Sequence, residues 1–218
     1  MRSPLLATGA VALSSICFGL VPLFGRLLLD EGLSPEAIAL YRFCLGLPLA
    51  LAFWPRRRTA RRSVATLAAG GVASGIGWTT YMTAIDHVSV ASAGVVYMSY
   101  PLFVVVLGWL LLGQRLTGRA LLGAALVVAG AVTVNPPAAV PPGDLLVLAA
   151  SLAAPMGFAL MVVLIVTTGH GLNARERWSA VCVGHVAGLL PAALLADPGA
   201  IIPATRDGWV WLAGLAAV

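Results

Sequence analysis

The chain has 218 residues, of which 60% are hydrophobic and only 10% are charged, and its formal net charge is +5. Its mean hydropathy is +0.98. Because a soluble domain carries about 25% charged residues and could not bury so much apolar surface, the composition excludes a soluble globular protein and predicts an all-α polytopic membrane protein.

The basic residues are all arginines, and five of them lie in the segment RRRTARR, Arg56 to Arg62. No aromatic residue interleaves this cluster, which argues against a nucleic-acid site and favours a loop that flanks the membrane. The cysteines, Cys17, Cys44 and Cys182, lie inside apolar runs and show neither a disulfide framework nor metal-ligand spacing. We therefore expect no cofactor, no metal and no nucleic-acid partner.

Seven apolar runs could each cross the roughly 30 Å hydrocarbon core, and an eighth begins near Gly208. The breaks between them are rich in Pro, Gly, Asn and Asp, which favour turns. The first run precedes Arg26 and ends without an A-x-A cleavage site, which favours a retained span over a signal peptide. In chain order the runs are 5–28, 35–54, 64–85, 89–112, 119–135, 144–167, 178–196 and 208–218.

The last run is too short to span a bilayer, because its helix would rise only about 16 Å. A terminal carboxylate near mid-bilayer would cost several kcal/mol. We therefore expect about 7–8 transmembrane helices and a C-terminal truncation or a fragment, with a re-entrant final segment as the alternative.

The arginine distribution predicts the orientation of the chain. A cytoplasmic N-terminus would leave only Arg26 and Arg206 in the outer loops, both near span ends. We therefore expect a multi-pass protein of the cell (inner or plasma) membrane. The cytoplasmic segments would then hold Arg2, Arg56–Arg62, Arg115, Arg119, Arg175 and Arg177.

Gly19 and Pro22 interrupt the helical pattern of the first run and predict a bend near mid-membrane. The sixth run holds Pro155 at the matching place, in the segment PMGF. Bent helices in corresponding halves of a membrane protein indicate a binding site between them.

Arg42 lies about seven residues into the second run, roughly 10 Å deep by helix rise. An arginine at this depth usually faces the bundle interior or a wet cavity. It could recognise a carboxylate or a phosphate, since a guanidinium forks well to either anion. Snorkelling to the interface and capping of carbonyls between helices remain open alternatives.

The third run has the segment GGVASGIGWTTYMTA, in which Gly71 and Gly75 form a small-xxx-small pair typical of close helix packing. Trp78 and Tyr81 follow at helical spacing. They could stack on a ligand or belong to an aromatic belt at the membrane interface.

The fourth run holds Tyr97, Tyr100 and Pro101 in the middle of an almost wholly apolar stretch. A proline frees a backbone carbonyl and kinks a helix, which either helps the helix pack or lines a cavity. Tyr97 lies four residues before Pro101, so we expect both on one face of a continuous helix. We predict that all three residues contact substrate.

His185 lies near the middle of the seventh run and could relay protons or make one interhelical hydrogen bond. No Asp or Glu lies in the interior of a run to join a histidine, which argues against an intramembrane enzyme. The chain also lacks a G-x-x-x-x-G-K-[ST] motif, so we expect no direct use of ATP.

The segment GLSPEAIALYRF, residues 32–43, and the segment GLNARERWSAVC, residues 171–182, open the second and seventh runs. Five runs precede the linker NPPAAVPP, and a repeat with an odd number of spans reverses its orientation. We therefore expect two inverted five-helix repeats. The first would cover residues 1–136, and an incomplete second would cover residues 137–218 with its first two helices and the start of a third.

The stretch from Tyr81 to Val134 resembles an EamA-type transporter of the drug/metabolite transporter (DMT) superfamily. The shared features are a small-residue-rich span, a helix with a central proline, a glycine-spaced helix and the early arginine in LYRFCLG. The resemblance implies ten spans in two repeats. The chain departs from the family at Gln114, where a glutamate is common.

This resemblance implies a secondary transporter that exports or exchanges small organic metabolites by alternating access. Amino acids, nucleotide-related compounds and amphipathic drugs are the expected substrate classes. The alternative is a truncated, non-transporting membrane protein or subunit, which needs a partner to complete the bundle. Either a homodimer or a partner subunit would then be required.

Overall fold

The computed structural model describes residues 4–44, 47–54, 58–134, 140–169 and 172–217, and every regular element in these ranges is a helix. This confirms the all-α prediction. The α-helices are α1 (Pro4–Asp30), α2 (Pro35–Cys44), α3 (Leu47–Ala52), α4 (Arg58–His87), α5 (Val90–Tyr97), α6 (Tyr100–Leu112), α7 (Gly118–Val134), α8 (Leu145–Ala150), α9 (Ala153–Thr168), α10 (Ala174–Ala187), α11 (Leu189–Leu195) and α12 (Arg206–Ala217), and two 3₁₀ turns cover Pro142–Asp144 and Pro198–Ala200.

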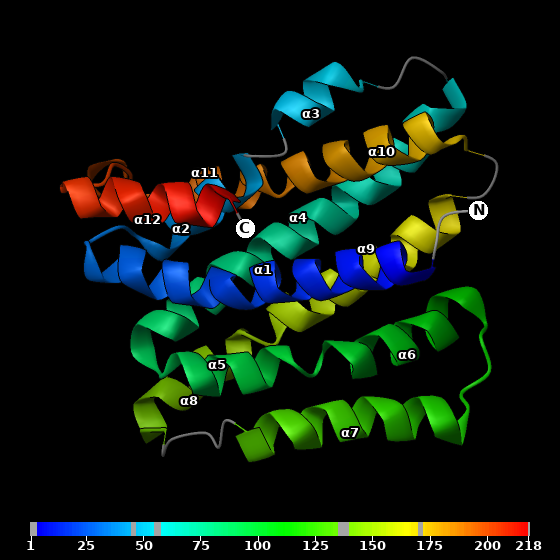
Figure 1. The fold of residues 1–218 in the computed structure, drawn as a ribbon, viewed down its shortest axis with the longest axis horizontal. Coiled ribbons are helices and arrows are strands. Elements are labelled where there is room, and N and C mark those ends of the chain that lie inside the picture. Colours follow the sequence, from blue (N-terminus) through cyan, green and yellow to red (C-terminus); the bar gives the residue numbers. More distant parts are fainter. Residues whose placement is uncertain (1–3, 45–46, 55–57, 135–139, 170–171, 218) are drawn as a thin grey trace.

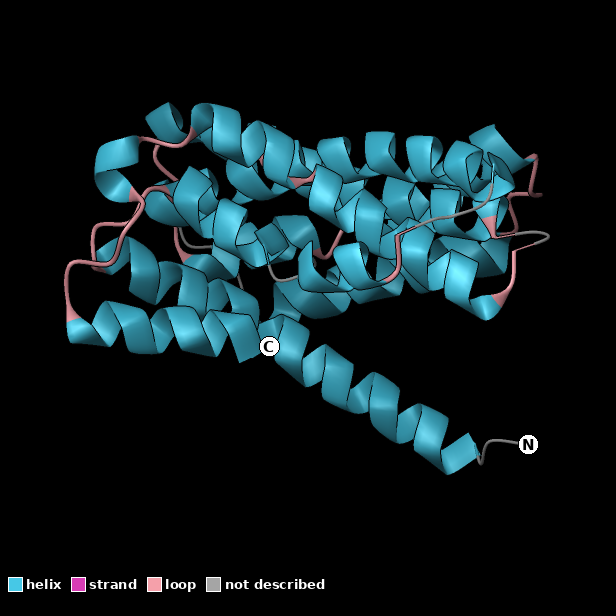
Figure 2. Cartoon of the chain, turned by 90° about the horizontal axis from the view of Figure 1, so that it is seen from above, coloured by secondary structure: helices cyan, strands magenta, loops and turns pink. Residues whose placement is uncertain are grey.

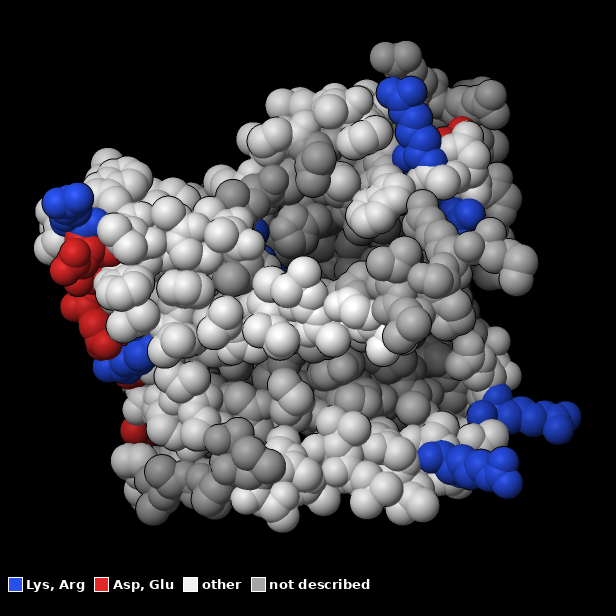
Figure 3. Space-filling view, in the orientation of Figure 1, with Lys and Arg blue, Asp and Glu red and all other residues white. Residues whose placement is uncertain are grey.

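Most of the long helices run side by side along one direction of the bundle (Figure 1). On the face shown in Figure 3, charged side chains gather at the two ends of this direction and leave the middle almost uncharged. Large apolar side chains are exposed between the ends, among them Leu146 at 79% and Leu194 at 76%. Such a surface suits lipid and would be unfavourable in water.

Three described helical segments are long and apolar enough to cross a membrane: Val90–Leu112, Pro142–Thr168 and Ala174–Leu195. A shorter apolar helix covers Gly118–Thr133. The middle of α4 is rich in Gly, Ser and Thr. This composition fits its position, because α4 packs on α9, α10 and α2 and so meets protein on several sides.

The contact of α4 with α9 and α10 is a backbone contact made through glycines. A Cβ on Gly71 would lie 1.6 Å from the carbonyl oxygen of Gly184, and one on Gly75 would lie 2.3 Å from that of Gly188. On α9, a Cβ on Gly157 would lie 2.7 Å from the carbonyl oxygen of Ala73. Only residues without a side chain fit at these positions, which confirms that Gly71 and Gly75 serve close packing.

Two of the predicted spans are interrupted just before a proline. Met98 and Ser99 separate α5 from α6, and Ser151 and Leu152 separate α8 from α9. Pro155 cannot donate to the carbonyl of Ser151, which accepts instead from the amide of Ala154 at 3.0 Å. Each break therefore lies where the proline removes a helical hydrogen bond.

The break in the fourth span corrects one prediction. Tyr97 and Pro101 do not share the face of a continuous helix, because Tyr97 ends α5 and Pro101 lies in the first turn of α6. A proline is well accommodated there, since first-turn amides have no partner within the helix. By contrast, α1 is assigned as one helix from Pro4 to Asp30, with Gly19 and Pro22 inside it.

The two halves of α1 have different surroundings. Its N-terminal half projects away from the bundle (Figure 2), and Leu13 and Ile16 are each 64% exposed. Its C-terminal half is anchored by Arg26, which donates to the carbonyl oxygen of Ile85 at 3.0 Å and pairs with Asp30 at 2.8 Å. Helix α12 also packs on α1.

Replacing Gly71 with alanine should destabilise the bundle by about 1–3 kcal/mol, because the new methyl group would overlap the Gly184 carbonyl and force α4 and α10 apart. Thermal unfolding of the purified protein in detergent measures this loss. The matched control is Gly123→Ala on α7, where an added Cβ meets nothing within 4 Å. Equal stability of the two variants would contradict the proposed backbone contact.

Candidate functional site

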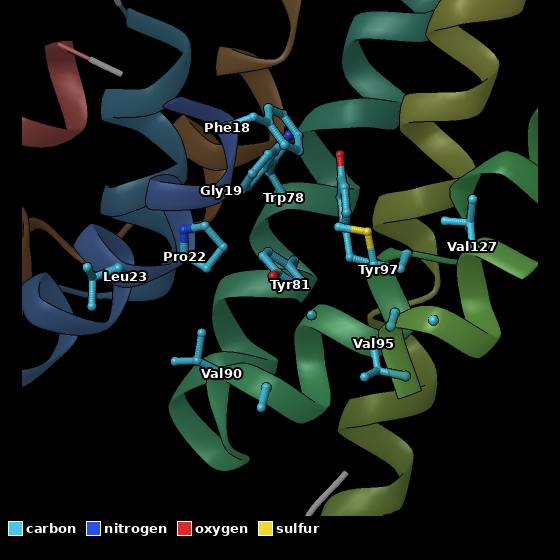
Figure 4. Close-up of a pocket in the computed structure, with 15 residues that line it drawn as sticks. Phe18, Gly19, Pro22, Leu23, Trp78, Tyr81, Val90, Val95, Tyr97 and Val127 are labelled. Carbon is cyan, nitrogen blue, oxygen red and sulfur yellow. The ribbon is translucent and has the colours of Figure 1, made fainter. Parts of the chain in front are cut away.

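The largest cavity described here has a volume of about 680 Å³ and lies between α1, α4, α5 and α7. Its lining includes the predicted bend residues Gly19 and Pro22 of α1. Figure 4 shows Phe18, Trp78, Tyr81 and Tyr97 around it, with valines completing the wall. We call it the aromatic cavity.

A second cavity, of about 250 Å³, lies between α1, α2, α4, α9 and α10. Arg42 and His185 are its ionisable lining residues, and Ser74 adds a hydroxyl. We call it the arginine cavity. Phe18 and Trp78 line both cavities, so these two rings form a shared wall between them.

The shared wall belongs to a larger cluster of aromatic rings. The Trp78 centroid lies 6.1 Å from that of Phe18 and 5.9 Å from that of Tyr97. Tyr97 also contacts Tyr81 at 5.3 Å, and Tyr100 contacts Phe158 at 5.3 Å. These spacings suit edge-to-face and tilted aromatic pairs. The cluster joins α1, α4, α5, α6 and α9 at one point.

Trp78 and Tyr81 are only 7% and 2% exposed. An aromatic belt requires rings that reach the lipid headgroups, and these two are enclosed by other helices. Their position inside the bundle therefore fits the cavity interpretation better than the belt interpretation.

Arg42 points into the bundle, with its guanidinium carbon 5.7 Å from the centre of the Trp78 ring. This is within the range of a cation–π contact. The side chain does not snorkel, because it lines the arginine cavity between α1, α2, α4, α9 and α10. Over the described ranges, the ion pair found is Arg26–Asp30, and no carboxylate pairs with Arg42.

Tyr97 carries a polar atom without a partner. Its side chain is 3% exposed, and its hydroxyl makes no hydrogen bond to any described residue. In Figure 4 the ring extends from α5 toward Trp78. A buried hydroxyl without a partner is unfavourable and needs an explanation.

The structure does not bring all the predicted site residues to a cavity. Tyr100 contacts Tyr97 and Phe158 but is not part of the lining of either cavity, and Pro101 is likewise absent from both linings. Pro155 is buried near the start of α9. The roles predicted for these residues in substrate contact and helix bending therefore stay predictions.

His185 lies beside Arg42 in the arginine cavity, and its ring centre is 4.8 Å from that of Phe43. Across the described part of the chain, no group of three His, Cys, Asp or Glu residues could hold a metal ion. The backbone of Arg42 lies within hydrogen-bonding reach of the His185 ring, so α10 contacts α2 at this point.

Phe18 and Phe158 both contact Tyr97, and neither was among the site residues predicted from the sequence. A signal for both was present. Phe18 lies four residues before Pro22 in the first run, and Phe158 lies three residues after Pro155 in the sixth. Each aromatic residue therefore lies about one helical turn from a proline that predicts a helix bend.

Comparison with protein families matches residues 5–135 to the EamA-like transporter family. The matched region covers more than half of the chain and includes α1 to α7 with both rings of the shared wall. No curated protein and no solved structure matches the chain.

Replacing Tyr97 with phenylalanine should stabilise the ligand-free protein by about 1 kcal/mol, because it removes a buried hydroxyl that has no partner and leaves the ring in place. Thermal unfolding in detergent measures the gain. The control is Tyr41→Phe on α2, which removes a phenol hydroxyl away from both cavities. A loss of stability in Tyr97→Phe that exceeds the control would show that the hydroxyl has a partner.

Proposed function

The chain belongs to the EamA-like transporter family, part of the drug/metabolite transporter superfamily, and on this basis we propose that it exports or exchanges small organic metabolites by alternating access. Family membership identifies a membrane transporter with a small-molecule substrate. The assignment of the pathway, the contact residues and the orientation is our proposal.

The observation that carries this mechanism is the pair of cavities divided by Phe18 and Trp78. The aromatic cavity lies toward the C-terminal half of α4, and the arginine cavity extends along α4 in the opposite direction to Gly71. An alternating-access carrier needs a site that is open to one side while a barrier closes the other. Two rings that line both cavities are suited to form that barrier.

We assign substrate contact to Arg42, Trp78, Tyr81 and Tyr97. Tyr100 contacts both Tyr97 and Phe158 and so supports the ring of Tyr97. Pro101 and Pro155 follow the breaks in two helices that contact this region, where changes of angle would be accommodated most easily. Gly19 and Pro22 provide a comparable place in α1 where the helix angle could change, beside the aromatic cavity.

Substrate or ion gradients would drive the transport. The acidic residues of the described ranges lie at or near helix ends, so no carboxylate is placed to carry protons through the middle of the bundle. His185 is the titratable group beside Arg42 and is our candidate for a proton relay. Exchange of one substrate for another requires no such relay.

We also propose the inverted repeat, with residues 1–136 and 137–218 as its two parts. In that arrangement α1 corresponds to α8–α9, and α4 corresponds to α12. The packing of α4 on α9 and of α12 on α1 supports this correspondence, because a two-fold axis relates one contact to the other.

A second candidate function is a membrane subunit that acts with a partner or as a homodimer. The projecting N-terminal half of α1, with its exposed Leu13 and Ile16, favours this candidate. Transport by the purified chain alone discriminates between the two functions.

In proteoliposomes that contain only this chain, we expect uptake from at least one pool of labelled amino acids, nucleosides or organic acids, above that of empty liposomes. Arg42→Ala should reduce this uptake about tenfold or more, because a charge-assisted hydrogen bond contributes about 1.5–3 kcal/mol. Arg177→Ala on α10, which lies outside both cavities, is the matched control. Absence of uptake would favour the subunit, and wild-type uptake by Arg42→Ala would refute the assigned site.

The orientation can be tested with single cysteines at Arg62 and Ala204, which are exposed at the two ends of the bundle. The background is a variant in which Cys17, Cys44 and Cys182 are alanine. In intact cells, a membrane-impermeant maleimide should label Arg62→Cys only after permeabilisation and should label Ala204→Cys directly. The reverse pattern would place the N-terminus outside the cytoplasm.

A further inference from the structure

We propose that the arginine cavity binds a flat aromatic anion with one carboxylate, which pairs with Arg42 while its ring packs against Phe18, Trp78 and Phe158. The inference rests on the proposed function, because it names the substrate class of that same site. It selects among the substrate classes that the family resemblance leaves open.

The charges that line the two cavities favour an anionic ligand. Arg42 contributes a positive charge to the arginine cavity, and no acidic residue lines either cavity. A charge removed from water without a partner is costly, and an opposite charge on a ligand would offset that cost. One arginine matches one carboxylate, and it would repel a cationic ligand.

A second donor lies in the cavity that holds the guanidinium. Ser74 lines the arginine cavity together with Arg42, and its hydroxyl can donate a hydrogen bond. The guanidinium itself lies over the ring of Trp78. A carboxylate has two oxygens that accept hydrogen bonds, so it could accept from the guanidinium and from the Ser74 hydroxyl together.

The aromatic lining determines the shape of the rest of the ligand. The Phe158 centroid lies 5.8 Å from that of Phe18 and 6.2 Å from that of Tyr97. A planar ring can stack on or meet the edges of these side chains, whereas a saturated ring of similar size gains only its apolar contact. The arginine cavity, at about 250 Å³, is below the usual range for drug-sized ligands and suits one or two fused rings.

The same features disfavour a zwitterion at this site. An ammonium group beside the carboxylate would require an acceptor or a negative partner, and the described lining provides none with a formal charge. A free aromatic amino acid should therefore bind more weakly than the corresponding aromatic acid.

The experiment is equilibrium binding to the purified full chain in detergent by isothermal titration calorimetry, with 2-naphthoate as the probe. Three comparison ligands each change one property: 2-naphthylmethylamine is a cation, decahydro-2-naphthoate is not aromatic, and 2-naphthylalanine is a zwitterion. We expect 2-naphthoate to bind at least tenfold more tightly than each of them. Equal or tighter binding of any comparison ligand, or no binding of 2-naphthoate up to millimolar concentration, would overturn the proposal.

The variants identify the site. Arg42→Gln should weaken 2-naphthoate binding at least tenfold, and Ser74→Ala should weaken it several-fold. Arg177→Gln and Ser63→Ala, which lie outside both cavities, are the matched controls and should bind as the wild type does. These controls also correct for uptake of the probe by the micelles. Unchanged binding by Arg42→Gln would refute the site.

The binding experiment and the transport experiment test the two proposals independently. If proteoliposomes take up another metabolite while 2-naphthoate does not bind, the ligand class is wrong and the transporter proposal stands. If 2-naphthoate binds at Arg42 and no pool is transported, the anion site stands and the transporter proposal is wrong.

Discussion

The rest of this structure depends on the direct backbone contact of α4 with α9 and α10. Gly71 meets Gly184, Gly75 meets Gly188, and Gly157 meets Ala73 at distances that exclude a side chain. In a membrane, where lipid is as apolar as leucine, such close packing replaces the hydrophobic effect as the force that joins helices. It places Trp78 at the centre of the bundle, where α1, α2, α5 and α9 can reach it.

Arg42 and Tyr97 place unsatisfied polar groups around this centre. The guanidinium has a π face as its neighbour and no carboxylate among the described residues, and the phenol hydroxyl has no hydrogen-bond partner. Both features lower the stability of the ligand-free protein, and a ligand that brings a negative charge to the arginine cavity would offset the cost at Arg42. Stability and ligand binding therefore place opposite demands on Arg42.

Pro101 and Pro155 shape the site without lining either cavity. Pro101 and Pro155 each follow a two-residue interruption, so the fourth and sixth spans are built from two helical pieces rather than one bent helix. Tyr97 ends the piece before Pro101, and Phe158 lies one turn after Pro155. The breaks thus position the rings that surround Trp78.

The sequence by itself determined the solvent, the helical class and the family, because apolar run length, turn residues and the motifs between Tyr81 and Val134 are local properties. It also identified Arg42, Trp78, Tyr81 and Tyr97 as unusual residues for their depth. Only the tertiary structure decided that Arg42 turns inward to Trp78, that Phe18 and Phe158 join the cluster, and that Pro101 lies in the first turn of a helix and lines neither cavity. The physical reason is that the direction of a side chain, and the partner it meets, depend on how closely α4 approaches its neighbours. That distance is fixed by contacts between residues far apart in the sequence, such as Gly71 and Gly184, which are 113 positions apart.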